Sequence, residues 1–264
     1  MSVNSYLEDV AKKLILSNEE ENKINNSIAY FKYNMQRYFG NSIIEIREFG
    51  SYERKTNLPR KVDSNSDVDI MIVFDDDGST PQTYLNRIRR AVELYYSSSD
   101  IKQSSPTIVL EMNHIKFEIT PAIKKYGLYY IKNEDSWKET DCLKDRDNLI
   151  KVNKQNNYKI KPIIRLIKYW NVSKNYKWIS SYIIEKSIVN KFDWYNWGCI
   201  NYIDYLIKSF ECVKENVNQK TYKDRIDIAL NTLINAKNQE RDYPLSALMK
   251  IESVRRRRRW NVGE

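Results

Sequence analysis

Three carboxylate residues in this sequence are spaced so that they could bind divalent cations. Asp67 and Asp69 stand at i and i+2 in residues 66–74, a run whose β-branched, apolar composition predicts a buried strand. Because side chains alternate along a strand, both carboxylates leave the same face. Two neighbouring anions on a buried strand repel each other and lose hydration, a cost that a bound cation removes. The pair therefore predicts a metal site, with Mg²⁺ or Mn²⁺ as the ion.

Glu118 is the third carboxylate, and a predicted hairpin brings it beside the first strand. Two apolar-rich runs, residues 107–112 and 115–120, are separated by Asn113 and His114, a spacing compatible with a two-residue turn. Three carboxylates can hold two Mg²⁺ ions that clamp the attacking and the leaving oxygen of an in-line phosphoryl displacement. The trio therefore favours nucleotidyl transfer with two metal ions as cofactors.

A Gly-Ser pair after another predicted strand supplies a candidate phosphate site. Residues 43–49 predict a strand, and the residues after Gly50 are compatible with a helix. A strand-to-helix turn at Gly50 and Ser51 would direct backbone N–H groups and a hydroxyl at a phosphate, and glycine permits the close approach. A Gly-Ser pair alone is most often an ordinary turn. Its combination with the Asp-x-Asp strand favours phosphate binding.

The order of these motifs resembles that of the polymerase-β-like nucleotidyltransferases. More narrowly, the chain is similar to the CD-NTase family, which comprises cGAS/DncV-like and oligoadenylate-synthase-like enzymes. Five segments within residues 50–185 carry this resemblance: Gly50-Ser51-Tyr52 with Thr56, Ser66-Asp67-Val68-Asp69-Ile70, Phe117-Glu118-Ile119-Thr120-Pro121-Ala122, Leu166-Ile167-Lys168-Tyr169-Trp170, and Ser180-Ser181-Tyr182 with Glu185.

The resemblance implies roles for the residues at the matching positions. Asp67, Asp69 and Glu118 would be the catalytic and metal-binding residues, and the Tyr182 ring would stack on the donor base. The nucleotide would be bound by Gly50, Ser51, Lys168, Ser181 and Tyr182. In this family the chemistry joins nucleoside triphosphates into cyclic or short linear oligonucleotides. These products act as second messengers that a downstream effector recognises, commonly in antiphage defence.

The chain departs from its relatives at two positions, and two other functions stay open. Lys55 stands where many relatives have glycine, and Glu118 stands where aspartate is common. One alternative is a nucleotidyltransferase with another acceptor, such as an RNA 3′ end or a small-molecule hydroxyl. The other is an inactive homologue that binds nucleic acid; the intact Asp67 and Asp69 argue against it.

The charge of the chain favours polyanionic partners. Its 264 residues carry a formal net charge of +9, part of which nucleoside triphosphates would explain. A candidate contact to an RNA or DNA activator is the run Arg255, Arg256, Arg257, Arg258 and Arg259. Such runs are most often solvated tails. Lys161, Arg165 and Lys168 recur on one helix face, for which a solvated charged face is the common alternative.

Composition also excludes some classes of protein. No stretch approaches the roughly 18–20 consecutive apolar residues of a membrane span, and the N-terminus lacks a signal-peptide pattern, so we expect a cytoplasmic protein without a membrane partner. Cys142, Cys199 and Cys212 are far apart and have no metal-ligand spacing. We expect them to be reduced, buried thiols without chemistry.

The elements that must position these residues predict an α+β fold. We expect a polymerase-β-like nucleotidyltransferase core, a mixed sheet flanked by helices, in residues 1–157, packed on a helical lobe in residues 158–264. Ser17 predicts the start of a long helix, and Thr80 the start of another. The polar segment 133–157 is expected to connect the lobes. The aromatic residues between Phe192 and Tyr205 are expected to pack in a core.

Overall fold

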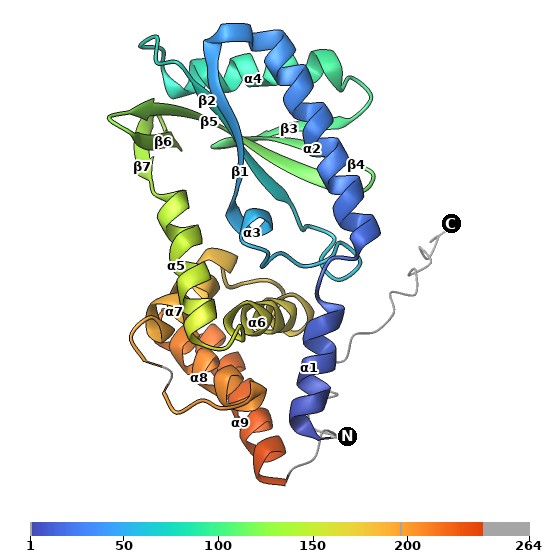
Figure 1. The fold of residues 1–264 in the computed structure, drawn as a ribbon, viewed down its shortest axis with the longest axis vertical. Helices are drawn as coiled ribbons and strands as arrows, with labels where there is room; N and C mark the ends of the chain where they lie inside the picture. The colour runs from blue at the N-terminus through green and yellow to red at the C-terminus, as the bar shows by residue number, and fades with distance from the viewer. Residues whose placement is uncertain (1, 196, 240–264) are drawn as a thin grey trace, which may run out of the picture. The chain divides into compact units, whose positions relative to one another are not determined.

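The computed structural model describes residues 2–195 and 197–239, which form two compact units (Figure 1). The first, here called the sheet unit, contains Leu16–Arg60 and Asn65–Lys151. The second, here called the helical unit, contains the described residues up to Ile15, the segment Lys61–Ser64 and the described residues from Val152 onward. This division differs from the predicted one because the described residues up to Ile15, the segment Lys61–Ser64 and residues 152–157 group with the helical unit.

The sheet unit has the predicted α+β architecture. Across the described residues, one seven-stranded sheet has the order β1-β2-β5-β4-β3, and β6 pairs with β5 and β7. β2 and β5 run parallel, whereas the other neighbouring pairs run antiparallel. The strands are β1 (Ile43–Phe49), β2 (Val68–Phe74), β3 (Asp100–Ser104), β4 (Thr107–Met112), β5 (Ile115–Lys125), β6 (Leu128–Asn133) and β7 (Ser136–Thr140).

β5 pairs with three other strands and connects the parts of the sheet. Its first half forms the predicted hairpin with β4, in which Met112 pairs with Ile115 across the Asn113-His114 turn. Its second half pairs with β6, and its other edge pairs with β2 along most of its length. Pro121, which has no backbone N–H to donate, stands where β5 changes partner from β4 to β6.

Two long helices pack on one face of this sheet: α2 (Asn18–Phe39) and α4 (Pro81–Tyr95). Both begin where the sequence predicts. The Ser17 hydroxyl accepts a hydrogen bond of 3.2 Å from the backbone N–H of Glu20, and the Thr80 hydroxyl caps α4 in the same way. A 3-10 turn, η1 (Gly40–Ser42), follows α2, and a short helix, α3 (Gly50–Glu53), follows β1.

We predicted that the polar segment 133–157 connects the two lobes, and the chain passes from the sheet unit to the helical unit within it, between Lys151 and Val152. The segment forms the end of β6, all of β7 and the helix α5 (Cys142–Gln155). Trp137 of β7 packs on the buried apolar cluster of the sheet unit. The ring centroids of Trp137 and Tyr84 of α4 lie 5.7 Å apart.

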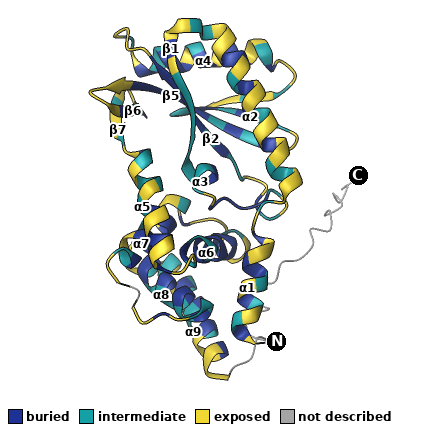
Figure 2. Ribbon diagram, in the orientation of Figure 1, coloured by how far each residue is buried: buried dark blue, intermediate teal, exposed yellow. Residues whose placement is uncertain are grey.

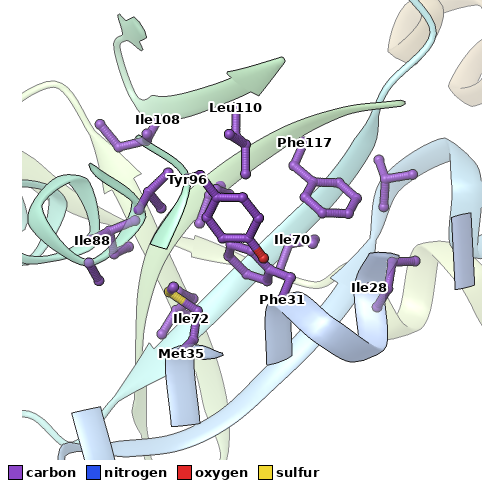
Figure 3. Close-up of a cluster of buried hydrophobic side chains, with 14 of the residues drawn as sticks. Ile28, Phe31, Met35, Ile70, Ile72, Ile88, Tyr96, Ile108, Leu110 and Phe117 are labelled. Atoms are coloured by element: carbon purple, nitrogen blue, oxygen red, sulfur yellow. The ribbon is translucent and has the colours of Figure 1, made fainter. Parts of the chain in front are cut away.

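The main core of the sheet unit lies between the sheet and α2 and α4 (Figures 2 and 3). Phe31 of α2 meets Phe117 of β5 with ring centroids 5.5 Å apart and an interplanar angle of 66°. Val68 and Ile70 of β2 and Ile119 of β5 are buried in the same cluster. Every second residue of β2 and β5 therefore faces this core, and the residues between them face the other side of the sheet.

Among its described residues, helices are the only regular secondary structure of the helical unit. They are α1 (Val3–Lys13), α6 (Ile160–Lys174), α7 (Ser181–Phe192), α8 (Tyr202–Glu215) and α9 (Lys220–Gln239), together with the last residues of α5. α1 contacts α6 and α8, and the Asn4 side chain accepts a hydrogen bond of 3.1 Å from the backbone N–H of Ile203. This packing groups the N-terminal residues with the C-terminal helices.

The aromatic stretch after α7 divides into buried and exposed residues. Phe192 and Tyr205 are buried with ring centroids 5.3 Å apart, which confirms core packing for these two. The same prediction was wrong for Trp194, Tyr195 and Trp197, which are exposed. Helix α7 ends at Phe192, so these three residues lie in a loop rather than on a helix face.

Two further expectations concern thiols and membrane segments. Cys142, Cys199 and Cys212 are free and buried, as predicted. Burial raises the pKa of Cys212 to about 12, which makes it unreactive near neutral pH. Among the described residues, every helix is too short or too polar to span a bilayer.

We expect Phe31→Ala to lower the free energy of unfolding of the chain by about 3–5 kcal/mol, because it leaves a cavity against Phe117. Tyr33→Ala on the same helix is the matched control. Its side chain is 62% exposed, and we expect a change within about 0.5 kcal/mol. Urea denaturation followed by circular dichroism measures both, and equal losses would contradict this account of the core.

Candidate active site

The three predicted carboxylates lie on the sheet face opposite the main core. Asp69 of β2 is the register partner of Glu118 on the parallel strand β5, and Asp67 immediately precedes β2. Val68 and Phe117, which alternate with these acids, are buried beneath α2 and α4. The sheet therefore places all three carboxylates on one face, over two adjacent strands.

Lys116 connects two of these acids. Its ammonium Nζ lies 2.9 Å from Glu118 Oε1 and 3.1 Å from Asp67 Oδ2. The Lys116 side chain is 15% exposed, compared with 27% for Asp67 and 30% for Glu118. Burial acts to lower the pKa of Lys116, but the hydrogen bond to Glu118 and the charges of both acids outweigh it, and the pKa is raised. One fixed positive charge is therefore shared by two carboxylates.

Gly50 lies directly against the third acid. β1 and β2 pair antiparallel with Phe49 opposite Asp69, so the turn after β1 passes over the Asp69 side chain. A Cβ atom on Gly50 would lie 1.9 Å from Asp69 Oδ2, and the Gly50 φ angle is +71°. Only glycine fits both the backbone conformation and the space. The predicted strand-to-helix turn is present, and α3 starts at Gly50.

The helix after this turn is held against the rest of the sheet unit. Tyr52 is buried and donates a hydrogen bond of 2.8 Å to Asn25 Oδ1 of α2. The backbone N–H of Thr56 donates to the Ser51 carbonyl at 2.9 Å. Lys55, at the position where many relatives have glycine, has a φ angle of 59°. Lysine thus keeps the left-handed conformation that glycine adopts more easily.

The three carboxylates are suitable ligands for a hard divalent cation, although their side chains are not arranged as a complete metal site. Among the described residues, no group of three or more His, Cys, Asp or Glu side chains is arranged to hold a metal ion. The carboxylates of Asp67 and Glu118 nevertheless converge on one cation, the Lys116 ammonium. Mg²⁺ prefers oxygen ligands, so Asp67, Asp69 and Glu118 fit the ion when the Lys116 ammonium moves away from the two acids that it contacts.

The predicted nucleotide-binding residues of the helical unit differ in their surroundings. Lys168 forms a buried ion pair with Glu185, so it does not lie on a solvated helix face. Ser181 is the first residue of α7, and the Tyr182 side chain is 54% exposed. Tyr182 is therefore not a core residue. Arg165 is also buried, and burial lowers its pKa to about 10. Arg255, Arg256, Arg257, Arg258 and Arg259 lie outside the described residues.

Comparison with known families fits this geometry. A family model described as the Second Messenger Oligonucleotide or Dinucleotide Synthetase (SMODS) domain matches residues 1–156, more than half of the chain. The chain belongs to the SMODS family. This membership confirms the resemblance to the CD-NTases that the sequence motifs indicate.

One curated relative supports the same family. A probable cyclic nucleotide synthase from Bacillus cereus (strain VD146) is 30% identical over 195 residues, which cover 57% of this chain and 57% of that protein. The matched region thus spans just over half the length of that relative.

Several solved structures share the fold of this SMODS chain. The cyclic AMP-GMP synthase DncV of Vibrio cholerae, in complex with a linear intermediate, has a TM-score of 0.78 at 8% identity, over 96% of this chain and 98% of DncV. CdnG of Bradyrhizobium diazoefficiens in complex with GTP has a TM-score of 0.75 at 11% identity, over 94% of each chain. CdnC of Escherichia coli MS115-1, in complex with HORMA-deltaN, has a TM-score of 0.69 at 13% identity, over 94% of this chain and 97% of CdnC. At these identities the likeness establishes the fold.

Lys116 is the site residue that motif analysis overlooks. It stands two positions before Glu118 on the same strand, so the alternation that pairs Asp67 with Asp69 also places Lys116 beside Glu118. The signal is present in the sequence, but a basic residue does not belong to the carboxylate motif. The choice of Lys116 partners depends on strand register, which only the folded sheet defines.

We expect Gly50→Ala to reduce product formation by at least about 100-fold, because the new methyl group would displace the Asp69 carboxylate. Gly78→Ala is the matched control: its φ angle is +78°, but nothing lies within 4 Å of the added Cβ. The backbone strain, about 1–2 kcal/mol, is common to both variants. Thermal unfolding measures the stability of both variants, and product chromatography should show the loss of activity confined to Gly50→Ala.

We expect Lys168→Met to lower the free energy of unfolding by about 3–5 kcal/mol, because it leaves the Glu185 charge buried. The double variant Lys168→Met/Glu185→Leu should recover part of this loss. Lys214→Met, which breaks a more exposed ion pair with Asp227, is the control and should cost at most about 1 kcal/mol. Urea denaturation distinguishes them, and a loss for Lys168→Met no larger than the control would contradict a buried pair.

Proposed function

We propose that this chain is a nucleotidyltransferase that joins nucleoside triphosphates into a cyclic or short linear oligonucleotide second messenger and releases pyrophosphate. The observation that carries the proposal is the carboxylate trio, Asp67, Asp69 and Glu118, on one sheet face beside the Gly50-Ser51 turn. Membership of the SMODS family and likeness to a cyclic nucleotide synthase support the same chemistry.

In this proposal the sheet unit aligns the reacting groups. Asp67, Asp69 and Glu118 would hold two Mg²⁺ or Mn²⁺ ions, which neutralise charge on the triphosphate and polarise the acceptor hydroxyl. The carboxylate nearest the acceptor hydroxyl accepts its proton. Because phosphoryl transfer requires little covalent participation by the protein, the rate depends on how well these residues fix the reactants.

The donor nucleotide would be bound by the residues at the family's matching positions. The Gly50 turn offers backbone N–H groups to the triphosphate, and Ser51 adds a hydroxyl. The family resemblance assigns triphosphate contacts to Lys168 and Ser181, and base stacking to Tyr182. The exposed ring of Tyr182 is compatible with stacking, whereas the Lys168 ammonium would also have to serve its buried pair with Glu185.

The proposed biological setting is cytoplasmic antiphage or innate immune signalling. The product would act on a downstream effector, and the run Arg255–Arg259 would contact an RNA or DNA activator. A polyanion contact of this kind would weaken steeply as salt is raised. The basic composition of the chain is compatible with it.

Mass spectrometry of reaction products tests the proposal. The full chain is incubated with all four nucleoside triphosphates and Mg²⁺ or Mn²⁺, with and without RNA, and the products are treated with phosphatase. We expect a phosphatase-resistant oligonucleotide, reduced at least about 100-fold in Asp67→Ala/Asp69→Ala. The matched control Asp75→Ala/Asp76→Ala removes the same charge at the exposed far end of β2 and should retain activity.

Other outcomes would support the alternatives. Labelled nucleotide transferred to an RNA 3′ end or to a small-molecule hydroxyl would identify a different acceptor. Absence of any product under every condition, together with RNA or DNA binding, would support an inactive nucleic-acid-binding homologue and overturn the proposal.

A further inference from the structure

The position of Lys116 in the sheet gives it two sets of possible acidic partners. On one side, its cross-strand partner on β4 is Glu111. On the other side, β2 brings Asp67 within reach, and Glu118 lies two residues further along β5. Residues directly opposite in an antiparallel pair share a sheet face, so Lys116 could pair with Glu111 as readily as with the trio.

Glu111 forms its ion pair with Arg60, whereas Lys116 pairs with acids of the trio. Arg60 Nη2 lies 2.6 Å from Glu111 Oε1. A guanidinium matches carboxylate geometry better than an ammonium does. Lys116 instead contacts Asp67 at 3.1 Å and Glu118 at 2.9 Å. The fold thus supplies one dedicated cation to the same two acids that a divalent ion would need.

We propose that Lys116 is the resident counter-cation of the carboxylate trio, which holds Asp67 and Glu118 together in the metal-free protein and competes with the first divalent ion for them. Metal binding then requires Lys116 to release at least one of the two acids. The inference rests on the proposed function, because it takes the trio as the metal site, and it makes Lys116 a positioning residue there.

This arrangement links metal loading to nucleotide binding. Lys116 reduces the negative charge that attracts a divalent ion, so the trio alone binds the ion weakly. A nucleoside triphosphate brings negative charge of its own, which restores the attraction and offers the Lys116 ammonium a new partner. The flexible four-carbon side chain can move between these partners without a change in the backbone.

Manganese binding to the full chain without nucleotide tests the inference, with electron paramagnetic resonance as the readout. We expect Lys116→Met to bind Mn²⁺ about tenfold or more tightly than the wild type, because a repelling charge is removed. Lys116→Arg keeps the charge and should resemble the wild type. Lys125→Met is the matched control; Lys125 pairs with Asp76 at 2.8 Å and is the last residue of β5, at the end of the strand away from Lys116.

Thermal unfolding in EDTA provides a second readout. Without Lys116 the acids repel one another, so we expect Lys116→Met to unfold at a lower temperature than the wild type and to regain the difference when Mn²⁺ is added. Lys116→Gln serves in the same two measurements if Lys116→Met does not fold. Lys125→Met should show no Mn²⁺-dependent recovery.

The outcomes separate this inference from the proposed function. Equal or weaker Mn²⁺ affinity in the neutral variants, or no binding to either protein, overturns the role of Lys116 even if the wild type makes an oligonucleotide. Tighter Mn²⁺ binding that Asp67→Ala abolishes supports the role, and it does so even if no nucleotide product forms.

Discussion

The register between β2 and β5 is the constraint on which the site depends. Asp69 is opposite Glu118 because β2 and β5 pair in parallel in one register, from Val68 and Phe117 to Phe74 and Ile123. A shift by one residue would turn Glu118 into the apolar core and bring Phe117 to the polar face. The main core prevents this shift, because Phe117 and Ile119 fill the space beneath α2 and α4. Core packing on one side of the sheet thus determines the placement of charge on the other.

Local patterns predicted much of the sheet unit correctly. The β-branched, apolar composition of residues 66–74 predicted the strand β2, which carries Asp69 and directly follows Asp67, and the Asn113-His114 spacing predicted the β4–β5 hairpin. Cap residues marked the starts of α2 and α4. These features follow from neighbouring residues alone, so sequence is sufficient. The β6–β7 hairpin was missed because β7 is polar apart from Trp137, and the packing partner of Trp137, Tyr84, lies on a helix distant in sequence.

The charged residues show where sequence analysis reaches its limit. Helical spacing puts Lys161, Arg165 and Lys168 on one face, but it does not reveal what that face meets, and the last two are buried. Lys116 is a charged strand residue whose partners likewise cannot be read from local spacing. Period-two alternation predicts which face of the sheet Lys116 lies on, but its ion pair with Asp67 depends on a strand that is distant in sequence. Long-range partners of ionic groups come from tertiary structure.

The alternating pattern of β5 also determines how the site would be lost. Residues 117–119 of β5 have hydrogen-bonded strands on both sides and buried rings behind them. Backbone amides in such a place exchange with solvent only when most of the unit opens. Fraying of chain ends or loops therefore leaves the acids assembled, and the site disappears only with global unfolding of the sheet unit.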